Sequence, residues 1–197
     1  MKRTSFISAI LTLVFFISGA AQTHKVNSQK SSLTVEGTSS LHDWEIDCEK
    51  VGGEATLVVS DGVVKNISTL KFSVEVEKME SGKSLMNSKT YDALKKDTYP
   101  TIQFELVKVV SITPAKAGVS SISAEGKLTI AGKTKTVVLD VSADVSEDVI
   151  AFSGEYKLDM TSFDVTPPTA LMGTIKTGKD VVVKYHIFYN HFKTIKP

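Results

Sequence analysis

The sequence predicts an all-β protein with one helix, folded as an antiparallel β-barrel of about eight strands. The first observation is that apolar and polar residues alternate with a period of two along most of the chain. The second is that turn residues separate these alternating segments. The third is that a single segment has helical spacing instead. We expect the sheet to close because closure removes the exposed strand edges that invite aggregation.

The alternation predicts which side chains point into the barrel. Residues 70–77 give the cleanest case, with Leu70, Phe72 and Val74 inward and polar residues between them. Residues 61–62, which read Asp-Gly, predict the hairpin turn before this strand, and the Gly pair at 52–53 predicts another turn. The other inward faces are predicted to carry His42, Trp44, Ile46 and Cys48; Ala55, Leu57 and Val59; Ile102, Phe104 and Leu106; Val137, Leu139, Val141 and Ala143; and Ile150, Phe152, Tyr156, Leu158 and Met160.

Residues 84–97 predict the one helix. Leu85, Met86, Tyr91 and Leu94 fall on one apolar side of it. Methionine adapts its shape to irregular partners, so Met86 suits a binding surface. We therefore expect this side of the helix to contact a ligand.

An apolar loop, punctuated by Pro167 and Pro168, leads into the last strand. It carries Leu171 and Met172. Apolar residues on a loop are costly in water unless something covers them, and that cover is either a ligand or one another. A chain that places such a loop beside a barrel is better suited to holding an apolar ligand than to breaking a bond.

Residues 1–21 have the layout of a secretory signal peptide: Lys2 and Arg3 come first, an apolar run spans 6–17, and small residues follow. The run is shorter than the roughly 20 residues that a membrane-spanning helix needs. An uncleaved anchor is the alternative. Cleavage after Ala21 would leave residues 22–197 as one secreted domain, which is long enough to bury a sizeable core.

Composition argues against several classes of partner and site. The formal charge of +1 would become −1 after loss of Lys2 and Arg3, so it gives no argument for nucleic acid or an anionic membrane. Cys48 is the one cysteine in the sequence, which excludes an internal disulfide, and we expect it to be a packed strand residue. The style of the signal suggests a bacterial periplasm.

The sequence shows no catalytic or metal-binding pattern. None of the four histidines has metal-ligand spacing to a cysteine or carboxylate, so we expect no metal and no cofactor. His42 and Asp43 are adjacent in a predicted strand and point to opposite faces, and no Gly-x-Ser-x-Gly elbow is present. We therefore predict that the protein is not an enzyme. A lipid- or quinone-modifying enzyme that uses His42 as acid or base is the alternative.

Four pieces of the chain together resemble the YceI-like family of polyisoprenoid-binding proteins. They are TSSLHDW at 38–44, LMNSKTYDALKKDTYPTIQF at 85–104, GKLTIAGKTK at 126–135 and PPTALMGTIKTG at 167–178. The resemblance spans roughly residues 24–189. It implies a lipocalin-like barrel with the helix near one mouth and an elongated apolar cavity. It further implies a periplasmic protein that binds a long-chain isoprenoid, with no catalysis and no metal; related barrels often pair as homodimers. The helix start, Lys83 to Asn87, is less charged than is common in the family. This difference affects the contacts to a lipid head group that the resemblance implies at this position.

We therefore predict a periplasmic carrier that holds a polyisoprenoid or isoprenoid quinone inside the barrel, with the lipid head at the mouth. A barrel filled by its own side chains, serving as a structural or stress-response module, is the alternative. Asn87, Tyr91 and Tyr156 are expected to offer polar groups to the head. The predicted ligand-binding residues are Trp44, Phe72, Met86, Asn87, Tyr91, Leu94, Phe104, Phe152, Tyr156, Leu171 and Met172.

Overall fold

The computed structural model describes residues 21–116, 118–146 and 149–190, and these form one antiparallel barrel. The expected signal peptide lies almost wholly outside the described residues. Within them the strands are β1 (Gln22–Val26), β2 (Ser32–Ser39), β3 (Trp44–Cys48), β4 (Val51–Ser60), β5 (Val63–Glu75), β6 (Met79–Glu80), β7 (Thr101–Lys116), β8 (Val119–Ile130), β9 (Lys133–Ser146), β10 (Val149–Asp159), β11 (Thr169–Ala170) and β12 (Ile175–Asn190). One α-helix, α1 (Ser84–Ala93), and the short 3-10 turns η1 (Val76–Lys78), η2 (Met160–Phe163) and η3 (Leu171–Gly173) complete the described chain.

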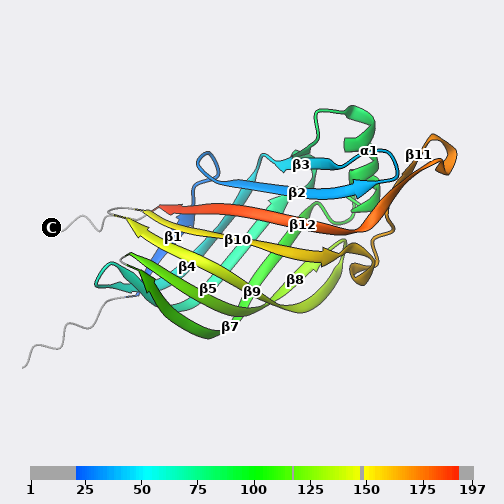
Figure 1. Ribbon diagram of the computed structural model, residues 1–197. Coiled ribbons are helices and arrows are strands. Elements are labelled where there is room, and N and C mark those ends of the chain that lie inside the picture. Colours follow the sequence, from blue (N-terminus) through cyan, green and yellow to red (C-terminus); the bar gives the residue numbers. More distant parts are fainter. Residues whose placement is uncertain (1–20, 117, 147–148, 191–197) are drawn as a thin grey trace, which may run out of the picture.

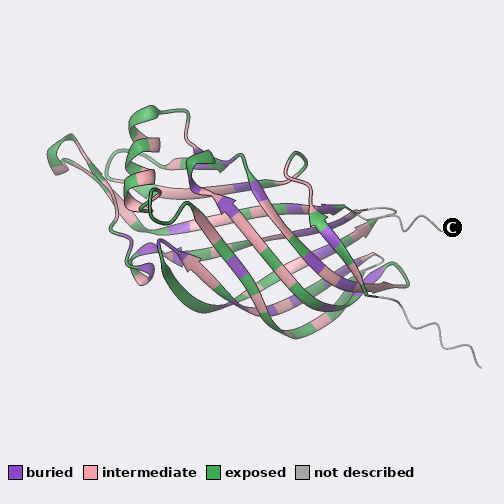
Figure 2. Ribbon diagram, turned by 180° about the vertical axis from the view of Figure 1, so that it is seen from behind, coloured by how far each residue is buried: buried purple, intermediate pink, exposed green. Residues whose placement is uncertain are grey.

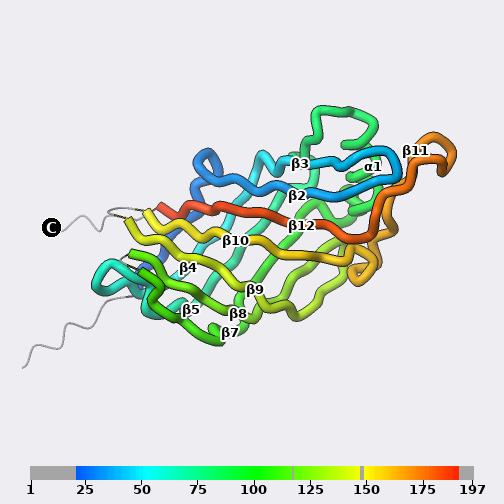
Figure 3. Tube along the Cα trace, viewed as in Figure 1, coloured from blue at the N-terminus to red at the C-terminus, as the bar shows by residue number. Residues whose placement is uncertain are grey.

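Eight of the described strands form a closed ring, as the alternation predicted. The order is β1-β4-β5-β7-β8-β9-β10-β12, and β1 closes it by pairing with the end of β12, Val26 opposite Tyr189. The earlier part of the same β12 edge pairs with β2, which continues through β3 to β6. In the chain, β6 follows β5 after the short turn η1. Strands β2, β3 and β6 therefore connect β12 to the end of β5 by a second route. Figures 1 and 3 show β12 running from one end of the barrel to the other.

The two ends of the barrel differ. Figure 1 shows α1 and the β11 hairpin at one end and the end of β12 that leads to the C-terminus at the other. Side chains fill the C-terminal end, where Leu57, Ile150 and Tyr189 are buried. Figure 2, coloured by burial, shows the exposed tip of the hairpin next to α1. We call the α1 end the mouth.

The turn predictions were correct at residues 61–62 and wrong at 52–53. Asp61 and Gly62 both have positive φ, as a two-residue hairpin turn requires. Gly53 instead lies inside β4, with a φ of 142°. A Cβ at this position would lie 2.1 Å from the backbone oxygen of Lys71 on β5, so the glycine permits a close approach of two strands.

The predicted helix is present but shorter than expected. α1 ends at Ala93, and Lys95 has a φ of 55°, which stops the helix. No residue of α1 is buried. Met86, Tyr91 and Leu94 pack partly against the core, so α1 lies on the barrel end rather than inside it. No helix in the described ranges is long and apolar enough to cross a membrane.

Candidate functional site

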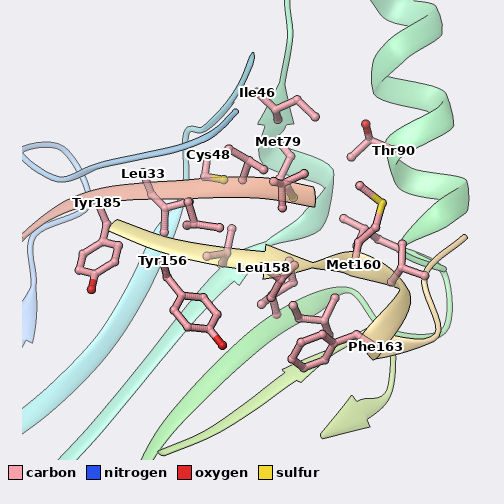
Figure 4. A pocket seen from close by; sticks show the side chains of 18 of the residues that line it. Leu33, Ile46, Cys48, Met79, Thr90, Tyr156, Leu158, Met160, Phe163 and Tyr185 are labelled. Carbon is pink, nitrogen blue, oxygen red and sulfur yellow. The ribbon is translucent and has the colours of Figure 1, made fainter. Parts of the chain in front are cut away.

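A cavity of about 470 Å³ enters the barrel from the mouth. Exposed residues of the β2–β3 loop and of α1 line its outer part, whereas buried residues such as Tyr189 line its inner end. Figure 4 shows apolar side chains from β2, β3, β6, β10 and η2 turned toward one space. Those labelled include Leu33, Ile46, Met79, Leu158, Met160 and Phe163.

Strand alternation explains why the lining is apolar. On β5, Leu70, Phe72 and Val74 face the cavity, while the residues between them face outward. The predicted inward faces of β7, β9 and β10 also line the cavity, for example through Leu106, Val141 and Phe152. The interior of the barrel is therefore a continuous apolar surface that is not completely filled by its own side chains.

Seven of the eleven predicted ligand-binding residues lie together in this lining, and four do not. The members of the lining are Trp44, Phe72, Met86, Leu94, Phe104, Phe152 and Tyr156. The residues outside it are Asn87, Tyr91, Leu171 and Met172. These four were expected at the mouth, and the structure places each pair outside the lining for a different reason.

Asn87 and Tyr91 are occupied by the segment that holds α1 in place. The amide nitrogen of Asn87 donates to one carboxylate oxygen of Glu80, and the Tyr91 hydroxyl donates to the other at 3.0 Å. The side-chain oxygen of Asn87 also accepts from the backbone N–H of Ser81 at 2.9 Å. Burial and the Glu80 carboxylate raise the pKa of Tyr91 above its usual value. These two side chains therefore anchor the helix rather than present polar groups to the cavity.

Leu171 and Met172 lie at the tip of the β11–β12 hairpin, beyond the cavity. Both are exposed, and both have positive φ, 47° and 58°. Bulky residues seldom adopt this conformation. The predicted apolar loop therefore projects from the mouth, where neither the barrel nor its own neighbours cover these two side chains.

The indole ring of Trp44 lies over the backbone of its neighbour Gly37, which has no side chain. It lies opposite Gly37 on β2, and a Cβ on Gly37 would be 2.2 Å from the indole ring. The indole N–H donates to the backbone oxygen of Thr38 at 2.9 Å. Glycine at position 37 therefore makes room for the aromatic ring, and the hydrogen bond fixes the orientation of that ring.

The charged residues of the lining all carry a basic side chain. Lys83 and Lys89 line the outer cavity, and neither has an ion pair among the residues that the structure describes. No carboxylate belongs to the described lining. His42 also lies there, with Nδ1 2.6 Å from the backbone oxygen of Asp43. The charged side chains that line the outer cavity are therefore positive, a feature that the net charge of the chain does not reveal.

Two polar groups lie deeper, and both are held in their neutral forms. Burial, with a smaller contribution from Asp47, raises the pKa of the Cys48 thiol to about 12. Burial, with a smaller contribution from Asp140, raises the pKa of Tyr185 to about 12. The Tyr185 hydroxyl has no hydrogen-bond partner in the described part of the molecule. A protonated thiol is a poor nucleophile, so these groups give the inner cavity weak polarity rather than reactivity.

Sequence reasoning missed several residues of the lining. Leu41 lies in the β2–β3 loop, Lys83 precedes α1, and Lys89 is a charged residue within α1. None of them belongs to a periodic apolar pattern. Tyr185 was recoverable, since it alternates with Val183 and Ile187 on β12. Within the described ranges, no group of three or more histidine, cysteine, aspartate or glutamate side chains could hold a metal ion.

Comparison with known proteins gives a family and several similar folds. The family model of the YceI-like domain matches residues 22–188. BcnA of Burkholderia cenocepacia is 20% identical, with a TM-score of 0.64, covering 83% of this chain and 98% of that one. A polyisoprenoid binding domain from Saccharophagus degradans is 10% identical, with a TM-score of 0.65, covering 86% of this chain and 98% of that one.

A YceI protein from Campylobacter jejuni is 13% identical, with a TM-score of 0.50, covering 98% of this chain and 100% of that one. Among curated proteins no match is found. At these identities the solved structures establish the fold alone, whereas the family model spans most of the sequence. The chain, an antiparallel barrel with an apolar cavity that opens beside its one described α-helix, therefore belongs to the YceI-like domain family.

Proposed function

We propose that the protein binds a long-chain apolar lipid, a polyisoprenoid or an isoprenoid quinone, inside the barrel and carries it through the periplasm. The observation that supports this most directly is the apolar cavity of about 470 Å³. Its volume falls in the range of roughly 300–1,000 Å³ that is usual for small-molecule sites. A barrel that served only as a filled structural module would have no need of it.

Apolar burial supplies the driving force for such binding. Each methylene group that moves from water into the lining contributes about 0.8 kcal/mol. We propose that Phe72, Phe104, Phe152 and Tyr156 contact the chain of the lipid. Trp44, Met86 and Leu94 would contact the part nearer the mouth, where the head group can remain in water.

The family and the sequence of the N-terminus support the rest of the proposal. One protein of similar fold is described as a polyisoprenoid binding domain, and a related ligand suits the cavity of this chain. Residues 1–21 have the pattern of a secretory signal peptide, which supports export to the periplasm. A carrier in that compartment would shield a poorly soluble lipid from water between membranes.

The test is native mass spectrometry of protein purified from the periplasm, followed by organic extraction and identification of the lipid. We expect a co-purified isoprenoid or quinone at one copy per chain. A clean ligand-free mass, with no uptake of added geranylgeraniol, would contradict the proposal and favour the ligand-free structural barrel.

A further inference from the structure

We propose that the rim of the mouth docks onto the surface of an anionic phospholipid bilayer. The rim consists of Leu41, Leu85, Leu171 and Met172 together with Lys83, Lys89 and Lys176. Its use in loading or unloading a lipid rests on the proposed function, but the docking itself is a separate property that can be measured without any cavity ligand.

The most exposed large apolar side chains of the described chain all lie on this rim. Leu41, Leu85 and Leu171 are 66%, 63% and 67% exposed, and Met172 is fully exposed. The next is Val110, at 56%, on the outer wall of β7. Single exposed apolar residues are ordinary, but a group of them at one end of a molecule marks an interaction surface.

Three separate segments bring these side chains together. The β2–β3 loop is tied to the hairpin because the Ser40 N–H donates to the backbone oxygen of Lys176 at 2.9 Å, and the Lys176 N–H donates to Ser40 Oγ at 3.1 Å. Leu41 on that loop and Leu85 on α1 line the same cavity entrance. Figures 1 and 2 show the hairpin projecting past α1 on the side away from the C-terminal end.

The tip of the β11–β12 hairpin exposes two apolar side chains in an unusual backbone conformation. Leu171 and Met172 occupy the left-handed region of φ, although glycine would fit that turn without strain. Strain of this kind persists where the residues serve a purpose other than stability. A tip that inserts shallowly into the headgroup region would cover these apolar side chains.

The charge around the rim favours an anionic surface over another protein. Carboxylates near the mouth are offset in part: Asp159 and Asp180 share Lys179, at 2.7 and 3.0 Å, and Asp164 pairs with Lys133 at 3.0 Å. Lys83, Lys89 and Lys176 have no ion pair among the described residues, and neither do the carboxylates Asp43, Glu80 and Asp92. None of these carboxylates lines the cavity entrance, whereas Lys83 and Lys89 do. Apolar side chains flanked by free lysines are the pattern by which proteins lie on anionic membranes.

The experiment measures co-flotation of the mature protein with vesicles of phosphatidylglycerol and phosphatidylethanolamine, and with vesicles of phosphatidylcholine alone. We expect binding to the anionic vesicles that weakens at high salt. The double variant Leu171→Ser/Met172→Ser should lose about tenfold or more in vesicle affinity. The matched control is Val107→Ser/Val110→Ser, which removes exposed apolar groups from the outer wall of β7 and should bind as the wild type does.

A second pair of variants tests the lysines. Lys83→Gln/Lys89→Gln should weaken binding to anionic vesicles and reduce its salt dependence, whereas Lys30→Gln/Lys127→Gln, at exposed positions elsewhere, should change neither. Wild-type protein that fails to float with anionic vesicles would overturn the proposal. So would a tip variant that binds as well as wild type, or sedimentation data in which the wild type is a dimer and the tip variant a monomer.

Uptake of the neutral dye N-phenyl-1-naphthylamine, measured without vesicles, separates docking from cavity binding. The tip variant should take up the dye as the wild type does while losing vesicle affinity. Vesicle binding by a wild-type protein that takes up neither dye nor lipid would contradict the proposed function and leave the docking surface intact.

Discussion

The two ends of the barrel are built from the same strands but treat their apolar side chains in opposite ways. At the C-terminal end, Leu57, Ile150 and Tyr189 are buried in one core cluster. At the mouth, Leu85 and Met172 are exposed. β12 extends from one end to the other (Figure 1), so the same strand contributes to both ends. A second buried cluster, which includes Met160 and Phe163, lies nearer the mouth, so both ends contribute packing and only the mouth also exposes large apolar side chains.

The largest effect should come from a cavity made at the closed end. Tyr189 is buried, and its ring meets that of Phe152 edge to face at 5.5 Å. We expect Tyr189→Ala to lower the free energy of unfolding by about 3–5 kcal/mol, since the removed ring leaves a void. Met172→Ala, at the mouth, should change it by less than about 0.5 kcal/mol. Urea denaturation measures both values, and equal losses would contradict the contrast between the ends.

Cys48 offers a chemical measure of how well the cavity excludes charge. Because burial raises the pKa of its thiol to about 12, only about one ten-thousandth is thiolate at pH 8. We expect a polar disulfide reagent to label it at least about a hundredfold more slowly than a cysteine placed at the exposed position 88 by Ser88→Cys in a Cys48→Ser background. The labelling rate of Cys48 should rise as the pH is raised. Equal rates at the two positions would mean that water and ions reach the inner wall freely.

Charges introduced at the mouth side of the lining should weaken ligand binding without unfolding the barrel. Met86 and Leu94 line the cavity but are not part of the buried core. We expect Met86→Asp or Leu94→Asp to lower the affinity for N-phenyl-1-naphthylamine about tenfold or more, because the carboxylate would lose its hydration against apolar surface. Ser88→Asp, on the exposed side of α1, is the control. Unchanged affinity in both test variants would refute the assignment of these residues to the site.

The smallest effect concerns the ion pair at the base of the hairpin. The hydrogen bond from Lys179, followed by that from Thr161, lowers the pKa of Asp159 from 3.8 to about 2. Its stabilisation is therefore present above the ordinary pKa and is lost as the pH falls through about 2. We expect Lys179→Met to raise the pKa of Asp159 in a carboxyl NMR titration. Lys184→Met, which breaks the pair with Glu36 instead, should leave it unchanged.

Local patterns predicted the wall of the barrel well. Alternation gave the inward faces of β5, β7, β9 and β10, and the Asp-Gly pair gave the turn before β5, because both signals depend on neighbouring residues only. The Gly pair at 52–53 gave a wrong turn for the same reason. Glycine is needed at position 53 because the backbone of Lys71 on the neighbouring strand lies too close for a side chain. A local sequence pattern cannot predict a contact between two strands.

The site was predictable where it coincides with a strand and not where it depends on loops. Phe72, Phe104 and Phe152 follow from alternation and lie in the cavity. The polar side chains of Asn87 and Tyr91 were expected to face a ligand, but they bind Glu80, and β6, which carries that residue, is too short to be recognised from the sequence. The route from β12 through β2 and β3 to β6 was not predictable either, because it depends on strand pairings between residues far apart in the sequence.

The placement of Trp44 has an optical consequence. It is the one tryptophan in the sequence, and it lies in the lining at the mouth, held by Gly37 and by its hydrogen bond to Thr38. Its ultraviolet emission therefore comes from a single place in the molecule, and a ligand that entered the cavity would change the polarity around it. The protein carries an intrinsic fluorophore for the occupancy of its own cavity, so filling and emptying can be followed in real time without a label.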